Sequence, residues 1–241
     1  SDEVNISMGL SVRDTFCGQL IHDVLSLHLN TLRPSAQGKA NFYYYDLRKF
    51  LSNPLLPLLM ESGDQKYFAR LKKGIMENPR KLLYSDYSNV EEENATQAQK
   101  LGMLSKELTL LKPWKDWISM CNELEYTCQK VFQATLRDAE MYQEREAAWK
   151  LMTSIQSIRN IFSVEEDEAV QQIHPVADFI KRSLNSLRVP LKGEPLKGIQ
   201  ILGLLETRAM DYEHVIILGV NEGFLPKSSR SDSFIPFDVR R

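Results

Sequence analysis

The chain has 241 residues, of which 43% are hydrophobic and 26% charged, so it is long enough to bury a sizeable core as one large domain or two small ones. Its formal net charge of −2 excludes a global basic field, although a local basic stripe would be enough to bind nucleic acid. No segment approaches the ~18 apolar residues of a membrane span, and the N-terminal sequence lacks the basic and apolar regions of a signal peptide. We therefore expect no membrane contact and a cytoplasmic location.

The three cysteines do not predict a disulfide framework. Cys121 and Cys128 would lie roughly 10 Å apart if they share a helix, which is too far to bridge. We expect Cys17, Cys121 and Cys128 to be buried thiols in a reducing compartment. The chain starts without a methionine and ends without a helix stop signal, so we expect a piece excised from a longer protein.

The first predicted elements are a strand and a helix. Val4–Met8 alternates apolar and polar residues, which predicts a short strand. Asp14 or Thr15 can cap the following helix, whose apolar stripe contains Phe16, Leu20, Val24 and Leu27. A strand followed by a helix is half of an α/β repeat. The only good partner strands lie near the C-terminal end of the sequence.

Residues 39–190 hold almost no strand pattern and predict a helical block. Apolar residues at helical spacing predict these helices: Asn41–Leu51, Gln65–Met76, a longest one from Pro113 to Ala139, Leu151–Phe162 and Ile173–Leu187. The polar stretch Ser85–Asn94 predicts a loop, and the prolines and glycines from Pro190 to Gly198 predict a linker.

The densest pattern lies between Gly198 and Pro226. Two short apolar runs, Ile199–Leu202 and Val215–Leu218, are bounded by turn residues and predict strands buried on both faces of a parallel sheet. Sheets of this kind place their working loops at the carboxyl ends of the strands. The predicted fold class is therefore α/β but mainly α, with a helical insertion in an α/β domain.

Sequence motifs for catalysis or metal binding are absent. No GxxxxGK[ST], HExxH or GxSxG pattern occurs, and no Cys/His pair has zinc spacing. The histidines are scattered and predict ordinary structural roles. The acidic runs Glu91–Glu93 and Glu165–Glu168 are typical of solvated surfaces. We expect no catalytic residue, no metal and no cofactor in this chain.

The segment VIILGVNEGFLP, residues 215–226, resembles motif V of superfamily I DNA helicases of the UvrD type. Five residues match the second half of that motif: Gly219, Glu222, Gly223, Leu225 and Pro226. The first half departs from it, with Gly203 at the Thr position, Leu205 at the His position, Arg208 at the Lys position and Ala209 at the Gly position. The Thr hydroxyl helps active helicases to contact the DNA backbone and couple it to ATP, and Gly203 has no side chain for this.

This departure resembles the inactivated helicase-like subunits of bacterial recombination nucleases, the AddB- and RecC-like proteins. The string LLETRAMDY is most similar to AddB-like proteins with a C-terminal PD-(D/E)XK nuclease domain, which would lie beyond Arg241. The resemblance implies three parts: residues 1–35 and 197–241 in a partial RecA-like 2A domain, and residues 36–196 as a helical 2B-like insertion.

The resemblance also implies a function. The chain would be a non-catalytic DNA-binding and scaffolding part of a helicase–nuclease that processes double-strand ends in recombinational repair. Its location would be the bacterial cytoplasm, in association with the nucleoid. Its partners would be DNA, as a single strand or a double-strand end, and a helicase–nuclease subunit, while any ATP and Mg²⁺ would bind elsewhere in the parent protein. The implied DNA-contacting or motif V-like residues are Gly203, Glu206, Thr207, Arg208, Asn221, Glu222, Gly223 and Lys227. Two alternatives stay open: a fragment of an ATP-driven superfamily I helicase, and a helical protein–protein interaction module.

An aromatic run followed by basic residues stands outside that motif. Phe42–Tyr45 precedes Arg48 and Lys49, a combination that could stack bases and bind phosphates of a single strand. Tyrosines at helical spacing more often pack against a neighbouring element. Packing is therefore the prediction for these tyrosines, with base stacking as the alternative.

Overall fold

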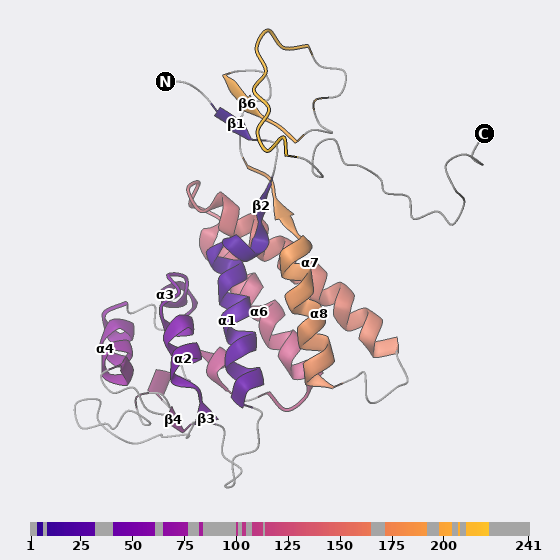
Figure 1. Cartoon of the computed structure of the whole chain (residues 1–241). Helices are drawn as coiled ribbons and strands as arrows, with labels where there is room; N and C mark the ends of the chain where they lie inside the picture. The colour runs from indigo at the N-terminus through magenta and orange to yellow at the C-terminus, as the bar shows by residue number, and fades with distance from the viewer. Residues whose placement is uncertain are drawn as a thin grey trace. The chain divides into compact units, whose positions relative to one another are not determined.

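The computed structural model describes residues 4–6, 9–31, 41–60, 65–76, 82–83, 100, 103–104, 108–112, 114–164, 172–191, 198–203, 207 and 211–221. The chain divides into two compact units, Ser1–Leu202 and Gly203–Arg241. The described part of the first unit is mainly helical, as predicted (Figure 1). The described part of the second unit contains no helix and no strand.

Helix α1 (Phe16–Thr31) begins where three of its backbone N–H groups find partners. The hydroxyl of Thr15 accepts a hydrogen bond from Gly18 N at 3.0 Å, which identifies Thr15 as the cap. The carboxylate of Glu144, on helix α7 (Tyr142–Val164), accepts from Phe16 N at 3.0 Å and from Cys17 N at 2.7 Å. These N–H groups have no partner within the helix itself, so Glu144 joins the start of α1 to α7.

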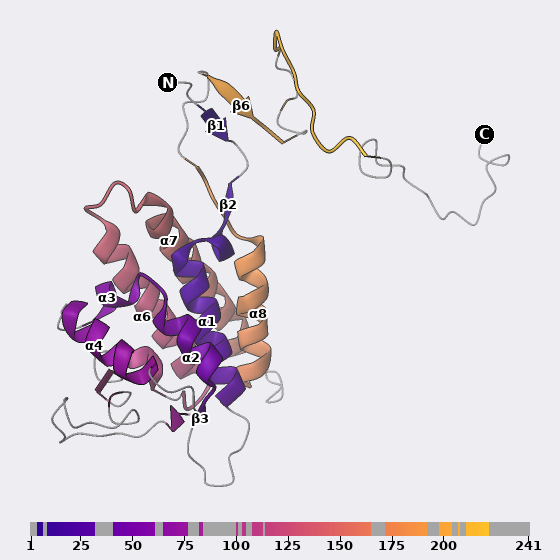
Figure 2. The same cartoon turned by 60° about the vertical axis from the view of Figure 1, so that its left-hand side comes forward.

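The core lies between α1, α7 and two further helices, α6 (Trp117–Thr135) and α8 (Ile173–Ser186) (Figure 2). Each helix buries an apolar stripe with a spacing of three to four residues, as expected for amphipathic helices. On α7 the buried stripe contains Leu151, Ile155, Ile158 and Phe162, which confirms the predicted face. All three cysteines are buried and free, also as predicted.

Smaller elements flank α1. Helices α2 (Tyr44–Leu51), α3 (Leu56–Leu59) and α4 (Gln65–Met76) follow it, together with strands β3 (Asn41–Phe42) and β4 (Leu82–Leu83) and the short 3₁₀ helix η3 (Thr109–Leu111). β3 and β4 pair in antiparallel fashion. The predicted helix Gln65–Met76 is confirmed residue for residue.

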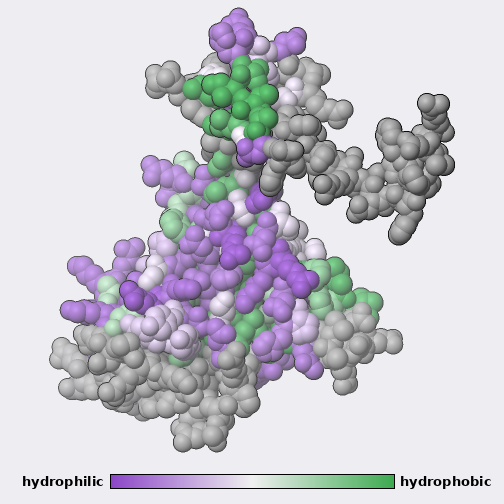
Figure 3. Space-filling model, in the orientation of Figure 1, coloured by the Kyte–Doolittle hydropathy of each residue, from purple (hydrophilic) through white to green (hydrophobic). Residues whose placement is uncertain are grey.

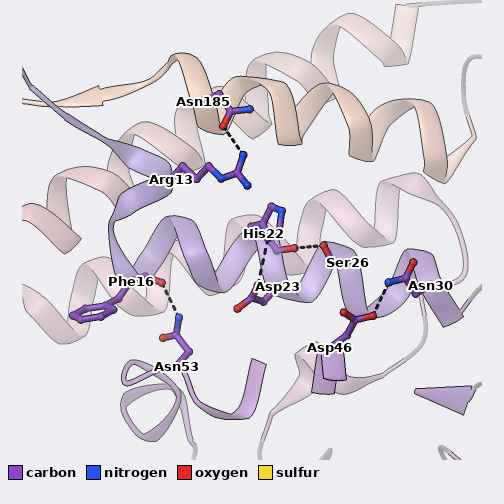
Figure 4. A network of polar contacts seen from close by, with 9 residues as sticks. All are labelled: Arg13, Phe16, His22, Asp23, Ser26, Asn30, Asp46, Asn53 and Asn185. Carbon is purple, nitrogen blue, oxygen red and sulfur yellow. Dashed lines mark hydrogen bonds and ion pairs between the residues drawn. The ribbon is translucent and has the colours of Figure 1, made fainter. Parts of the chain in front are cut away.

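Polar contacts hold α1 to its neighbours (Figure 4). Asn30 donates to Asp46 of α2 at 2.5 Å, and Asn53 donates to the carbonyl of Phe16 at 2.8 Å. Arg13, from the 3₁₀ helix η1 (Val12–Asp14), donates to Asn185 of α8 at 3.0 Å. These bonds link α1 to α2 and to Asn53, which precedes α3, and they link η1, just before α1, to α8.

Two pairs of strands lie next to the helical part in the sequence. β2 (Leu10–Ser11) pairs antiparallel with β5 (Arg188–Val189), and Val12 N continues this ladder by donating to Leu187 O at 3.0 Å. β1 (Val4–Ile6) pairs in parallel with β6 (Ile199–Ile201), with Val4 opposite Ile199. The predicted partnership between the first strand and the C-terminal apolar run is therefore confirmed.

The longest helix was predicted wrongly. Pro113 does not open it, because Asp116 caps α6: its carboxylate accepts from Ser119 N at 2.6 Å while the Ser119 hydroxyl accepts from Asp116 N. α6 ends at Thr135, and Ala139 lies in the turn before α7, which is the longest helix among the described residues. A local capping box outweighs a proline signal three residues earlier.

The prediction of two strands buried on both faces was also wrong in part. Val215–Leu218 forms no strand, and the exposed fractions of Ile216 and Leu218 are 87% and 86%. β6 is a strand, but Ile199 and Ile201 are 58% and 45% exposed. An apolar run becomes a buried strand only when other strands and covering helices are present. The described residues supply β6 with one neighbour, β1.

Helix α1 belongs to the core of the helical part. α1 was placed with the first strand, yet it packs into the same core as α6, α7 and α8. Judged by the shared core, the helical part runs from η1, which follows β2, to α8, which precedes β5.

Candidate nucleic-acid interface

Three of the predicted motif V-like residues lie within the described part of the chain. Gly203 and Thr207 are half-buried, and Asn221 is exposed. Asn221 N donates to Gly219 O at 2.9 Å in a tight turn where Gly219 has a φ of 72°. That backbone conformation favours glycine, although a Cβ at Gly219 would meet nothing within 4 Å. Glu206, Arg208, Glu222, Gly223 and Lys227 lie outside the described residues.

Two tyrosines at the start of α2 are exposed. The strand β3 alternates its side chains, so Phe42 is fully buried against His28 while the next residue, Tyr43, points outward. Tyr43 and Tyr45 are 46% and 60% exposed, and their ring centroids lie 5.5 Å apart. Only Tyr44 is half-buried. Packing against a neighbour therefore accounts for one of the three tyrosines, and the other two form an exposed aromatic pair.

Basic side chains share the exposed face of α2 with Tyr45. Arg48 and Lys49 follow Tyr45 by three and four residues, a spacing that places all three on one side of the helix, and all are exposed. The acidic residue of this helix, Asp46, accepts a hydrogen bond from Asn30 and also favours the charged form of Lys181 on α8. The exposed face of α2 therefore carries net positive charge.

Helix α4 carries a second basic face. Lys66, Arg70 and Lys73 are exposed and are spaced by four and three residues, so they form one stripe. The opposite face buries Phe68, Leu71 and Ile75. None of the residues of α4 is acidic. Tyr44 Oη lies 3.5 Å from Met76 O, which ties the beginning of α2 to the end of α4.

The basic stripe on α4 was not predicted from the sequence. The spacing of Lys66, Arg70 and Lys73 by four and three residues was a readable signal for it. The structure adds that the other side of α4 faces the core, so these three basic residues lie on its outer side. We refer to Tyr43, Tyr45, Arg48 and Lys49 as the α2 face, and to Lys66, Arg70 and Lys73 as the α4 stripe.

The buried titratable groups serve the fold. His28 is 4% exposed, and burial lowers its pKa to about 4. Its Nε2 donates to Leu110 O at 2.7 Å, and its ring stacks on Trp114 with centroids 4.0 Å apart. The predicted structural role of this histidine is confirmed.

The buried thiols are poor nucleophiles. The pKa of Cys17 is raised by a hydrogen bond with the Cys128 side chain and by burial, and burial raises the pKa of Cys121 to about 12. Burial also raises the pKa of Glu144, while its hydrogen bonds to Cys17 N and Phe16 N act in the opposite direction. Thiolates are the reactive form of cysteine, so these residues have the properties of core side chains.

No known protein family, curated protein or solved structure matches this chain. Within the described ranges, no three His, Cys, Asp or Glu side chains are grouped in a way that could hold a metal ion. None of the helices that the structure describes combines the length and apolar character needed to cross a membrane.

Proposed function

We propose that this chain is a DNA-binding and scaffolding part of an inactivated superfamily I helicase-like protein of the AddB- and RecC-like type. In this proposal it belongs to a cytoplasmic helicase–nuclease that processes DNA double-strand ends in recombinational repair. The observation that carries the proposal is the parallel pairing of β1 with β6 at the two ends of a long helical part. A RecA-like 2A domain interrupted by a helical 2B-like insertion would have this layout.

The short parallel pair also supports an extended sheet. Two strands alone are marginally stable in water, and parallel sheets are normally covered on both faces. The exposure of Ile199 and Ile201 fits strands that further parts of the parent protein would cover. In the proposal, those parts also bind ATP and Mg²⁺, and the chain itself neither hydrolyses ATP nor cuts DNA.

The α2 face and the α4 stripe would provide the DNA contacts. Lysine and arginine bind phosphates without reading sequence, and each phosphate contact releases counterions, so binding weakens as salt rises. The net charge of the whole chain is −2, so DNA would be held by these local basic surfaces. The motif V-like loops, with Arg208 and Lys227, would contribute in the assembled protein.

Fluorescence anisotropy with a labelled duplex that carries a single-stranded tail tests this function. We expect binding whose logarithm falls linearly with the logarithm of the salt concentration. Replacing Lys66, Arg70 and Lys73 together by Gln should weaken binding and reduce the salt slope by up to about 3. The matched control replaces Lys112, Arg137 and Arg182, which are exposed outside α2 and α4, by Gln.

Two results would contradict the proposal. Equal losses in both triple variants would show that only overall charge matters and that the α4 stripe is not a binding surface. Robust ATP hydrolysis by the isolated chain would instead favour an ATP-driven helicase. Thermal melting of both variants should accompany the titrations, because a folding defect would also weaken binding.

A helical protein–protein interaction module is the second candidate. The observation that favours it is the exposure of apolar side chains at the end of α7, where Ile161 and Val164, one turn apart, are 63% and 81% exposed. Large exposed apolar groups mark interaction surfaces when they are contiguous. Absence of salt-dependent DNA binding, together with self-association in sedimentation experiments that Val164→Lys abolishes, would favour this candidate.

A further inference from the structure

We propose that the α2 face is a stacking site for the bases of single-stranded DNA, with the rings of Tyr43 and Tyr45 as its platform. Arg48 and Lys49 bind the phosphates beside the stacked bases. The inference rests on the proposed DNA-binding function and names the form of DNA that this surface takes.

The first step is the exposure of the two rings. Their exposed fractions of 46% and 60% leave aromatic surface in contact with water, where it gains nothing from packing. The two rings are tilted by 46° to each other, and Tyr44 meets Tyr45 edge-on with centroids 5.9 Å apart. The contacts with Tyr43 and Tyr44 hold the Tyr45 ring in place while more than half of the residue stays accessible. Every base has an aromatic face, so such a platform accepts bases without sequence preference.

The second step is the position of the cations. Arg48 and Lys49 lie one turn of α2 beyond Tyr45, and one turn is about 5.4 Å. Their long side chains therefore reach phosphates on either side of a base that stacks on Tyr45. Stacked aromatic rings next to a basic groove are the combination by which single strands are held.

The third step is the choice of partner. The residues of α2 and α4 include Arg48, Lys49, Lys66, Arg70, Lys72 and Lys73 but only one acid, Asp46, which is hydrogen-bonded to Asn30. This charge is complementary to a polyanion. Bases inside a duplex are stacked on one another and cannot reach the tyrosines, so the site selects unpaired strands. Figure 3 shows that the visible face of the helical part is largely hydrophilic, apart from an apolar patch at its right-hand edge.

The test uses the whole chain with labelled oligothymidine, a blunt duplex and an abasic strand of the same length. Tyr45→Leu keeps an apolar side chain but removes the ring, and should weaken binding of oligothymidine about tenfold. Its effect on the duplex and on the abasic strand should be small, and Tyr45→Phe should bind oligothymidine like the wild type. Tyr126→Leu is the matched control, because Tyr126 is 45% exposed on α6 and also has a cation, Lys130 Nζ, 4.9 Å from its ring.

Three results would overturn the inference. They are wild-type affinity for oligothymidine in Tyr45→Leu, an equal loss in Tyr126→Leu, and abasic-strand binding as tight as that of oligothymidine. If the chain binds the duplex in a salt-dependent manner but Tyr45→Leu does not weaken binding of oligothymidine, the stacking site is refuted and the proposed function stands. If the chain binds neither DNA, the proposed function fails as well.

Discussion

Acid should unfold this protein partly through one buried histidine. His28 is enclosed by Phe42, Trp114 and the carbonyl of Leu110, and burial lowers its pKa from 6.5 to about 4. In the unfolded chain the imidazole regains its ordinary pKa, so the unfolded state binds the proton more readily. The stability that neutral His28 provides is therefore complete above pH 6.5 and is lost as the pH falls towards 4.

The size of this effect follows from the two pKa values. A difference of one pKa unit corresponds to about 1.4 kcal/mol, so the whole change from 6.5 to about 4 corresponds to about 3 kcal/mol. At pH 5 most of the unfolded chains carry the proton while the folded chains do not, and the loss is already about 2 kcal/mol. A domain is usually stable by about 5–15 kcal/mol, so this loss should be easy to measure.

This loss of unfolding free energy is measured by urea unfolding of the wild type and of His28→Gln between pH 7.5 and pH 4.5. Glutamine keeps an Nε2–H group that can donate to Leu110 O but does not titrate. We expect the wild type to lose about 2 kcal/mol more than the variant between pH 7.5 and pH 5, whatever their stabilities at pH 7.5. Glu144, whose pKa is raised by burial, shifts stability in the opposite direction on acidification, but both proteins contain it. If the unfolding free energies of the two proteins change in parallel with pH, the conclusion that His28 is buried in its neutral form is refuted.

Substitutions at three further positions test the helix ends by urea unfolding at pH 7.5. Glu144→Gln turns one acceptor oxygen towards α1 into an amide group, and should destabilise the fold by about 1–3 kcal/mol; an unchanged midpoint would show that the carboxylate does not cap α1. Asp116→Ala should cost about 1 kcal/mol by removing the cap of α6, whereas Asp116→Ser should keep most of the stability. Gly18→Ala places a Cβ 1.8 Å from the carbonyl oxygen of Val12, and should cost about 1–3 kcal/mol or more; wild-type stability would mean that the backbone there moves freely.

The helices were predictable where one local pattern decides them. α4 and α8 have apolar residues at helical spacing, and the structure gives α4 its predicted ends and ends α8 one residue before the predicted end. The start of α6 was not predictable in this way, because two signals compete there. The hydrogen bonds between Asp116 and Ser119 decide the outcome in favour of a start at Trp117.

The exposure of the candidate site was not predictable from residue types. Tyr43, Tyr44 and Tyr45 have the same side chain, yet one is half-buried and two are exposed. The difference depends on which residues α4 and α1 bring against α2, including the Met76 carbonyl next to Tyr44. The same limit applies to Val215–Leu218, where composition indicates a strand but burial depends on neighbours that the described residues do not supply. In both cases the missing information is tertiary.

The connections between the strands explain why the chain needs a linker on one side only. Residues 7–9 join β1 to β2, whereas residues 190–198 join β5 to β6. Because β1 and β6 are parallel, a chain that leaves the carboxyl end of β1 has to return to the amino end of β6. The antiparallel β2–β5 ladder holds the two ends of the helical part side by side. Only the connection from β5 to β6 therefore has to span the distance back to the amino end of β6. The long segment rich in proline and glycine before β6 therefore follows from the parallel pairing, which is the same feature that supports an insertion into a RecA-like sheet.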